Sequence, residues 1–439
     1  MRAPGPAWGQ GAAVLGSGVA YVLLAYATPR PDFGSLLLLF AAAFGGYAWL
    51  LYRPLPLRYG LLAALLLRLL WLPALPALSD DYHRFRWDGA LVVAGQSPYR
   101  YRPDELLSGR PTAAPASIYP LLNSPHYYSV YPPVSQAAFG LASKLFPGSA
   151  RGFVIVLRLL LLAAEAATAA LLVALLRHFG QPPRQAFLYL LNPLVVVELA
   201  GNLHFEALST CGLLAAIWAL TQGRRTLSAG ALAVSVAAKL LPLLLLPLLL
   251  RRLGWRAFLA YASLLAMGLM VLFGPFLSLE LVRNFSRSLD LYFHKFEFNA
   301  SLYYLMRAVG YWRTGYNEIA LIGTHLGLVA VAWVAVLGWR ERQPTLRTLP
   351  LAALAALTGY YLLATTVHPW YLTPLVALSV FTRFRFALVW SGLAVLSYAA
   401  YRNSGYAESL TLVAAEYVVV LAVLGWELAH RPLESPTRG

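Results

Sequence analysis

The chain has 439 residues, of which 59% are hydrophobic and 12% are charged, and its mean hydropathy is +0.63. A soluble domain carries about 25% charged residues, so this composition excludes an ordinary soluble fold. The net charge of +16 does not indicate a nucleic acid partner, because the basic residues stand singly or in pairs between apolar segments. The single cysteine, Cys211, excludes an internal disulfide and a thiolate metal site.

Apolar segments of membrane-spanning length recur along the whole chain, which predicts an all-α polytopic membrane protein of about 12–13 transmembrane helices. The first segment ends near Ala25-Tyr26-Ala27, which resembles a signal-peptide cleavage site, but we interpret it as an uncleaved span. The predicted spans are 11–27, 34–52, 59–78, 152–177, 186–200, 205–221, 256–277, 318–338, 348–366, 369–382, 386–401 and 409–428.

Short loops rich in arginine alternate along the chain with loops that carry the acids. By the positive-inside rule, the basic loops and both termini are predicted to be cytoplasmic. The basic residues are Arg53, Arg58, Arg177, Arg184, Arg224, Arg225, Arg251, Arg252, Arg256, Arg340, Arg342, Arg347, Arg383, Arg385, Arg431 and Arg438. The acids predicted on the opposite side are Asp32, Asp80, Asp81, Asp88, Asp104, Glu105, Glu206, Glu280, Asp290, Glu297, Glu318 and Glu408.

Residues 226–250 decide the topology of everything that follows them. A single crossing there would place Arg251 and Arg252 outside and invert the later spans. Lys239-Leu-Leu-Pro242 interrupts the segment, and Pro247 follows. We therefore predict a broken or re-entrant pair that enters and leaves on the cytoplasmic side, since broken helices are tolerated where they line a protein cavity. Lys239 is a functional candidate there, or it reaches toward the interface.

Two outer segments, 79–133 and 278–317, are longer than the other connections, which is typical of functional loops. Both are rich in Tyr, Trp, Arg and His, residues that suit sugars and phosphates. An interfacial aromatic belt would explain scattered Tyr and Trp equally well, but not a cluster of acids. Residues 134–146 are too short to span and predict an amphipathic helix in the outer interface.

The densest polar cluster is Ser79-Asp80-Asp81-Tyr-His-Arg84-Phe-Arg86-Trp-Asp-Gly at the outer end of the third span. One interpretation is structural, with Arg84 and Arg86 pairing with the carboxylates. The other is a general base that takes a proton from an acceptor hydroxyl. The outer residues His126, His204, Glu206 and His368 show no metal-type spacing, so no metal site is assigned, and a divalent metal stays an open question.

Further polar clusters fall on the same side under a topology derived from Lys and Arg alone. Groups that converge at one mouth of a helix bundle form a site. The clusters are Asn123-Ser-Pro-His126, Tyr131-Pro-Pro-Val-Ser-Gln136, Asn202-Leu-His204-Phe-Glu206, His294-Lys295-Phe-Glu297-Phe-Asn299-Ala-Ser301 and His368-Pro-Trp370-Tyr371.

Together these motifs resemble the GT-C superfamily of polytopic glycosyltransferases, and within it the bacterial GT87-type mannosyltransferases. The resemblance covers about residues 79–382 and rests on the order of the motifs Asp80-Asp81-x-x-Arg84-Phe, Tyr131-Pro-Pro, Asn192-Pro-Leu with Glu198 and His204, Lys239-x-x-Pro242, Phe-Glu297-Phe-Asn299 and His368-Pro-Trp370-Tyr371. In that superfamily the catalytic loop normally follows the first span of the core, whereas here two extra spans precede it. The expected organisation is two N-terminal helices (1–58), a GT-C-like catalytic core (59–338) and C-terminal helices (339–439).

The resemblance implies transfer of a sugar, with mannose the first choice, from a polyprenyl-phosphate donor to a glycolipid or glycan at the outer face of a bacterial plasma membrane. It places the catalytic base at Asp81, with Asp80 the second choice. The residues expected to bind donor sugar or phosphate are Arg84, His126, Tyr131, His204, Glu206, Lys239, Lys295, Glu297, Asn299, His368, Trp370 and Tyr371.

Two other classes of protein stay open from the sequence. Arg158, Glu165 and Glu416 lie within predicted spans, and charges at membrane depth are a feature of transporters, so a lipid or sugar-lipid transporter is the main alternative. A structural subunit of an envelope assembly is the third, although such a protein has no need of acids clustered at the end of a span.

Overall fold

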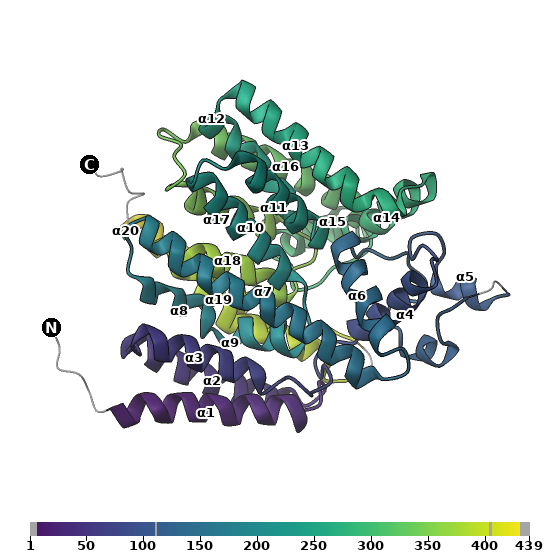
Figure 1. Ribbon diagram of the computed structural model, residues 1–439, viewed down its shortest axis with the longest axis horizontal. Coiled ribbons are helices and arrows are strands. Elements are labelled where there is room, and N and C mark those ends of the chain that lie inside the picture. The colour runs from purple at the N-terminus through teal and green to yellow at the C-terminus, as the bar shows by residue number, and fades with distance from the viewer. Residues whose placement is uncertain (1–6, 110–111, 404–405, 431–439) are drawn as a thin grey trace.

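The computed structural model describes residues 7–109, 112–403 and 406–430. Helices make up the regular structure of these residues, and a single bridge between extended segments joins Phe298 to Thr366. The helices run side by side in one bundle (Figure 1). The prediction of an all-α fold is confirmed. Arg431 and Arg438, which were predicted to be cytoplasmic, lie outside the described part of the chain.

Six of the described helices are long and apolar enough to cross a membrane. Each coincides with a predicted span, because at 1.5 Å per residue about 20 apolar residues cover the roughly 30 Å hydrocarbon core. They are α1 (Ala7–Tyr26), α2 (Phe33–Tyr52), α7 (Ala150–His178), α13 (Trp255–Phe273), α16 (Ile319–Arg340) and α20 (Leu410–His430).

The other predicted spans are shorter or broken. Three of them, 348–366, 369–382 and 386–401, correspond to α17 (Leu349–Leu363), α18 (Thr373–Ser379) and α19 (Phe386–Leu393). The 3₁₀ helix η7 (Ala394–Tyr401) continues α19. The predicted spans 186–200 and 205–221 form one bent pair, in which Pro193–Gly201 and α10 (Glu206–Thr221) meet at 114°. By length alone the described residues hold six spans, or seven with the bent pair, fewer than the count from hydropathy.

The third predicted span, 59–78, is helical only over α3 (Leu57–Leu69). Pro73 and Pro76 follow, and proline removes a backbone donor and breaks a helix. Arg158 of α7 compensates, because its guanidinium donates to the carbonyls of Leu72 and Ala74 at 2.8 and 2.7 Å. Irregular backbone at membrane depth is tolerated only with such protein partners.

Residues 226–250 reverse direction at Lys239, as the charge pattern predicted. Helix α11 (Arg225–Ala238) lies antiparallel to α10, since the Ser235 hydroxyl donates to the Ser209 carbonyl and the Ser228 hydroxyl to the Ala216 carbonyl. The 3₁₀ helix η4 (Leu241–Leu249) then leads to α12 (Leu250–Leu253), whose arginines contact the C-terminal end of α16. The predicted break at Lys239–Pro242 is therefore confirmed.

The two long loops fold into short helices at one end of the bundle. They are α4 (Asp81–Val93), α5 (Pro103–Leu107), η1 (Ala116–Leu121) and α6 (Pro133–Leu145) in the first loop, and α14 (Leu279–His294) and α15 (Leu302–Thr314) in the second. Figure 1 shows α4, α5, α6 and α14 at the end away from α8 (Phe187–Leu190) and α12. The helix predicted at 134–146 is α6, and it packs against α4 and buries Phe139 completely.

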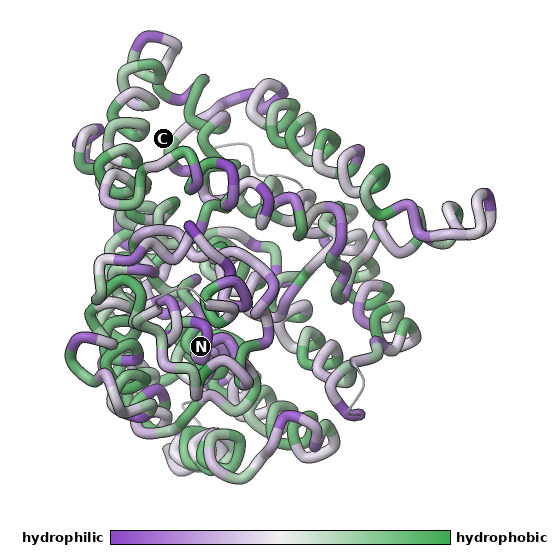
Figure 2. Tube along the Cα trace, turned by 90° about the vertical axis from the view of Figure 1, so that its right-hand side faces the viewer, coloured by the Kyte–Doolittle hydropathy of each residue, from purple (hydrophilic) through white to green (hydrophobic). Residues whose placement is uncertain are grey.

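Contacts between loops show which loops lie at the same end of the bundle, and this grouping agrees with the one predicted from the charges. At the basic end, the Gln181 amide donates to the Phe381 carbonyl, and the Arg385 N–H donates to Glu427. At the other end, Arg30 pairs with Asp80. Figure 2 looks onto this second end, where hydrophilic segments run through the loops in the middle of the view.

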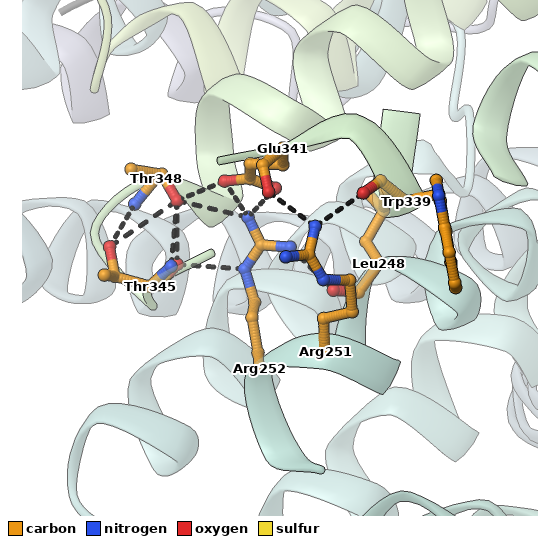
Figure 3. Close-up of polar contacts among 7 residues, drawn as sticks. All are labelled: Leu248, Arg251, Arg252, Trp339, Glu341, Thr345 and Thr348. Carbon is orange, nitrogen blue, oxygen red and sulfur yellow. Dashed lines mark hydrogen bonds and ion pairs between the residues drawn. The ribbon is translucent and has the colours of Figure 1, made fainter. Parts of the chain in front are cut away.

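Arg252 of α12 generates the first prediction (Figure 3). Its side chain is only 1% exposed, and its guanidinium lies 2.6 Å from Glu341 and donates to the Thr345 carbonyl. The Glu341 side chain is 18% exposed, so loss of this pair should cost less than the roughly 3–5 kcal/mol of a fully buried pair. We still expect Arg252→Ala to lower the unfolding temperature of the protein in detergent, measured by tryptophan fluorescence.

The neighbouring Arg251 provides a matched control. It is exposed, and its guanidinium donates to the backbone carbonyls of Trp339 and Glu341. Arg251→Ala removes a charge from the same turn and leaves the ion pair between Arg252 and Glu341 in place, so its unfolding temperature should fall less. Equal losses in the two variants would contradict the explanation by the ion pair.

Candidate active site

Two adjacent carboxylates, Asp80 and Asp81, begin helix α4. Asp80 is the N-cap residue, and its carboxylate forms an ion pair with Arg30. Asp81 is the first helical residue, and its Oδ1 accepts a hydrogen bond from the Asn123 amide at 2.8 Å. The N-terminal end of a helix dipole favours negative charge. The pair is therefore asymmetric: a cation neutralises Asp80, whereas a neutral amide holds Asp81.

A buried network fixes α4 to the first outer loop. The Arg84 guanidinium pairs with Asp88 at 2.8 Å and donates to the carbonyls of Ser124 and Tyr127, each at 3.0 Å. Asp88 also accepts a hydrogen bond from Gln136 at 3.0 Å. Arg84, predicted to contact phosphate, is 2% exposed and holds the loop that carries Asn123.

Aromatic packing joins the start of α4 to the segment before α10. The Phe85 ring stacks on Phe139 of α6 at 4.4 Å and meets Phe205 edge to face at 5.8 Å. Tyr131, predicted to pack on a sugar, lies edge to face with Phe85 at 4.9 Å. This cluster places the two carboxylates beside residues 202–206.

The backbone that leads to His204 is irregular and buried. Asn192 caps the short helix α9 (Pro193–Val195), and residues Val196–Gly201 form a π-helical turn, η3. Leu203 has a φ of 65°, a left-handed conformation that is uncommon for a leucine. π-Turns and strained residues of this kind concentrate at functional sites.

Glu198, fully buried in η3, organises this turn. Its carboxylate accepts hydrogen bonds from the Tyr398 hydroxyl at 2.7 Å and the Asn202 amide at 3.0 Å, and lies 3.4 Å from Nε2 of His204. The Asn202 side-chain oxygen accepts from the Leu78 N–H. One carboxylate thus links His204 to the residues immediately before Asp80 and Asp81.

Three parallel rings form the centre of the site. Trp370, in the 3₁₀ turn η6 (Pro369–Leu372), stacks on His204 at 3.8 Å and on His368 at 4.3 Å. Imidazoles cover both faces of the indole, so Trp370 holds the two histidines parallel. Burial, together with the neighbouring His204 and the Lys239 ammonium, lowers the pKa of His368 to about 3. Its Nδ1 is buried without a hydrogen-bond partner in the described structure.

A half-buried cation lies beside this stack. The Lys239 ammonium is 2.8 Å from the Glu206 carboxylate at the start of α10 and 5.0 Å from the centre of the Tyr371 ring. The Asp81 carboxylate lies within electrostatic range of the same Tyr371 hydroxyl. Lys239, Tyr371 and Asp81 therefore border one region between α4 and η6.

The second outer loop reaches the stack through Phe298. The Phe298 N–H donates to the Thr365 carbonyl, its carbonyl accepts from the Val367 N–H at 2.8 Å, and its ring lies 4.6 Å from His368. The next residue, Asn299, has a φ of 46° and donates its N–H to Glu408 at 2.6 Å. Its amide donates to Glu416, within α20, at 3.2 Å.

The carboxylates around this loop are all held by neighbours. Glu297 pairs with Arg307 and accepts a hydrogen bond from the Tyr303 hydroxyl at 2.5 Å. Burial raises the pKa of Glu408, while its hydrogen bonds from Tyr304 and Asn299 oppose that rise. The contacts of Glu297 lie within the second outer loop, and Glu408, just before α20, joins this loop to the C-terminal part of the chain.

The structure gathers some predicted site residues and separates others. Those that border the ring stack are Asp81, His204, Glu206, Lys239, His368, Trp370 and Tyr371, with Asn299 and Glu297 adjoining through Phe298. His126 is exposed and bonds to Asp104 at 2.9 Å, and Lys295 is exposed at the end of α14. Sequence analysis assigned no role to Arg30, Tyr398 or Glu408. A lone arginine in a short outer loop was the available signal for Arg30.

Charged residues inside the spans have protein partners. Arg158 donates to four backbone carbonyls, and Arg68 of α3 pairs with Glu165 of α7 at 2.8 Å. A cavity of about 470 Å³ lies against this second pair and extends along α7 to Arg177, toward the basic end. Across the described ranges, no three His, Cys, Asp or Glu side chains are grouped to hold a metal ion.

The bundle and its clustered carboxylates, imidazoles and aromatic rings define a polytopic membrane protein with a candidate active site at the end opposite its basic loops. Residues 6–254 match the model of the MptA_B family, described as alpha-(1->6)-mannopyranosyltransferase, N-terminal domain, so the chain belongs to this family. The chain is therefore a membrane glycosyltransferase, and its resemblance to GT-C mannosyltransferases is confirmed. The comparison with curated proteins finds no match.

The low pKa of His368 generates the second prediction. Its imidazole stays neutral at any pH above about 4, so protonation of His368 cannot shape the activity profile near neutrality. We expect His368→Asn to reduce sugar transfer by the same factor at about pH 5.5 and about pH 7.5. If the factor by which His368→Asn lowers sugar transfer differed severalfold between these two pH values, His368 would titrate in this range as an exposed histidine does. That result would contradict the prediction.

Proposed function

We propose that the protein transfers a sugar, mannose in the first instance, from a polyprenyl-phosphate donor to a hydroxyl of a glycolipid or glycan at the extracytoplasmic face of a bacterial plasma membrane. The observation that carries this proposal is the convergence of Asp81, Lys239 and the His204–Trp370–His368 stack at the end opposite the basic loops, in a chain of a mannosyltransferase family.

Asp81 is the general base of this mechanism. The acceptor hydroxyl loses its proton to the Asp81 carboxylate as its oxygen bonds to the anomeric carbon. The bond between that carbon and the phosphate oxygen breaks, and polyprenyl phosphate leaves with the bonding electrons. The Asn123 amide orients the carboxylate through a 2.8 Å hydrogen bond, and Asp81 lies in the first turn of α4.

Positive charge and hydrogen-bond donors stabilise the leaving phosphate. Lys239 contributes the charge beside Tyr371, while Glu206 holds its ammonium in place. The neutral His368 imidazole offers its unpartnered Nδ1 to the donor. Preorganised groups of this kind are commonly a large part of catalysis because they need no rearrangement during the reaction. Trp370 holds the two imidazoles parallel by stacking between them. Tyr371, the next residue, faces the sugar in this mechanism.

One observation favours an enzyme over the transporter. Transport sites place charged groups near the midplane of the membrane. The in-span charges Arg158, Glu165 and Glu416 here hold backbone carbonyls, Arg68 and Asn299 respectively. They stabilise breaks in the helices, and the groups suited to chemistry lie at the end of the bundle.

The third prediction tests the base. Asp81→Asn keeps the size of the side chain and removes the proton acceptor, so transfer from a polyprenyl-phosphate mannose donor by the purified protein should fall by about 10²–10⁴-fold. The assay measures mannosylated product in detergent. Asp80→Asn is the matched control and should retain most activity, because Asp80 already has a cationic partner. Full activity in Asp81→Asn would reject the mechanism.

The fourth prediction tests the face of the membrane. Cys211 is the single cysteine, so a Cys211→Ser background allows site-directed labelling. The side chain of His126 is 67% exposed in the first outer loop, and Arg225 is exposed at the start of α11 at the basic end. In intact cells, an impermeant maleimide should label His126→Cys directly and Arg225→Cys only after permeabilisation. The reverse pattern would invert the proposed topology.

A further inference from the structure

The turn between α1 and α2 presents one arginine toward the site. Arg30 lies between Pro29 and Pro31, and proline on both sides restricts the backbone of the turn. The Thr28 hydroxyl caps the end of α1 on the Leu23 carbonyl, and the Asp32 side chain caps the start of α2. The turn therefore holds the backbone of Arg30 in a restricted conformation.

The hairpin that carries this turn is itself fixed to the core. Gly46 of α2 brings its backbone against Ala13 and Ser17 of α1, where a larger residue would clash with the Ala13 carbonyl and the serine hydroxyl. The Tyr47 hydroxyl donates to the Leu188 carbonyl at 2.7 Å. The position of Arg30 is consequently set by packing along the whole length of two spans.

Arg30 joins two elements that border the active site. Its guanidinium pairs with the Asp80 carboxylate and lies 4.5 Å from the centre of the Tyr401 ring at the end of η7. The Arg30 side chain is 25% exposed and that of Asp80 is 44% exposed. Because both side chains are partly exposed, the pair by itself adds little to the stability of the fold.

We propose that Arg30 is a positioning residue for sugar transfer, which neutralises Asp80 so that the adjacent Asp81 stays ionised and free to take the acceptor proton. This inference rests on the proposed function, in which Asp81 is the base. A second carboxylate close by disfavours ionisation of the first, and a cation beside the two offsets this effect. The α1–α2 hairpin would in this way supply part of the catalytic apparatus.

Other ionisable groups face the same carboxylates and belong in the pH argument. They are Tyr371 from η6, Tyr401 from η7, and Tyr82 and His83 from α4 itself, the last two with Arg86 beside them. Asp80 pairs with Arg30 rather than with Arg86. The proposal therefore assigns the acid limb of the activity profile to the balance between Arg30 and the two aspartates.

The test compares pH profiles of kcat/KM for four proteins in the full-length chain: the parent, Arg30→Ala, Asp80→Asn and the double variant. Arg30→Ala should move the acid limb of kcat/KM about one pH unit upward, so that it loses up to about tenfold on that limb and recovers the parent rate at higher pH. Asp80→Asn removes the charge that Arg30 offsets, so the double variant should regain the rate and the profile of Asp80→Asn. Arg30→Lys should keep most of the parent rate.

Three outcomes would overturn the proposal. A raised KM for the donor with an unmoved acid limb would make Arg30 a phosphate ligand instead. A loss that the double variant does not recover, accompanied by a lower unfolding temperature, would make it a structural tie of the hairpin. A parent-like Arg30→Ala would show no role.

Arg402 provides the control, because it stacks on Phe33 at 4.8 Å near the same turn and forms no ion pair with an acid among the described residues, so Arg402→Ala should match the parent. The two proposals fail separately. If Asp81→Asn is inactive and the pH profile of Arg30→Ala equals that of the parent, only the role of Arg30 is rejected. If Asp81→Asn is fully active, the proposed function itself is rejected.

Discussion

The guanidinium of Arg158 donates to the carbonyls of Leu72, Ala74, Ala200 and Gly201, and the rest of the site depends on this interaction. In hydrocarbon, a backbone carbonyl without a partner costs several kcal/mol, so a helix that ends early needs another donor. Arg158 supplies donors both to the segment after α3 and to the C-terminal end of η3. The segments that follow, one leading to Asp80 and Asp81 and the other to His204, are consequently held side by side.

The same constraint explains why the candidate site consists of broken helices. An intact α-helix satisfies its own backbone and projects side chains only from its flank. At 70–80, 202–205, 239–240 and 364–368 the chain leaves the helical conformation, and side chains from these breaks meet. Asp81, His204, Lys239 and His368 each come from one of these breaks or from its edge. Glu198, Asn202 and Phe298 provide the polar and aromatic partners that the interrupted backbone lacks.

The sequence predicted the features that depend on local composition. Arginine placement predicted which loops share an end, and Lys239–Pro242 predicted the reversal that keeps those ends together. Hydropathy overestimated α3, because it does not register that Pro73 and Pro76 end the helix while Arg158 stabilises the rest. Arg158 itself was read as a transport candidate, since its partners are backbone atoms far away in the chain. For the same reason, spacing alone did not predict that Trp370 lies between two histidines.

The family match and the site divide the chain differently. Residues 6–254 include the aspartate pair, His204, Glu206 and Lys239, whereas His368, Trp370 and Tyr371 follow the matched region. The ring stack joins the two parts, because His204 lies on one face of Trp370 and His368 on the other. Asn299, Glu408 and Glu416 hold the second outer loop against the same stack from the C-terminal side. The matched region therefore carries the carboxylate and the ammonium, and the later helices set the position of the imidazoles and of the tyrosine that faces the sugar in the proposed mechanism.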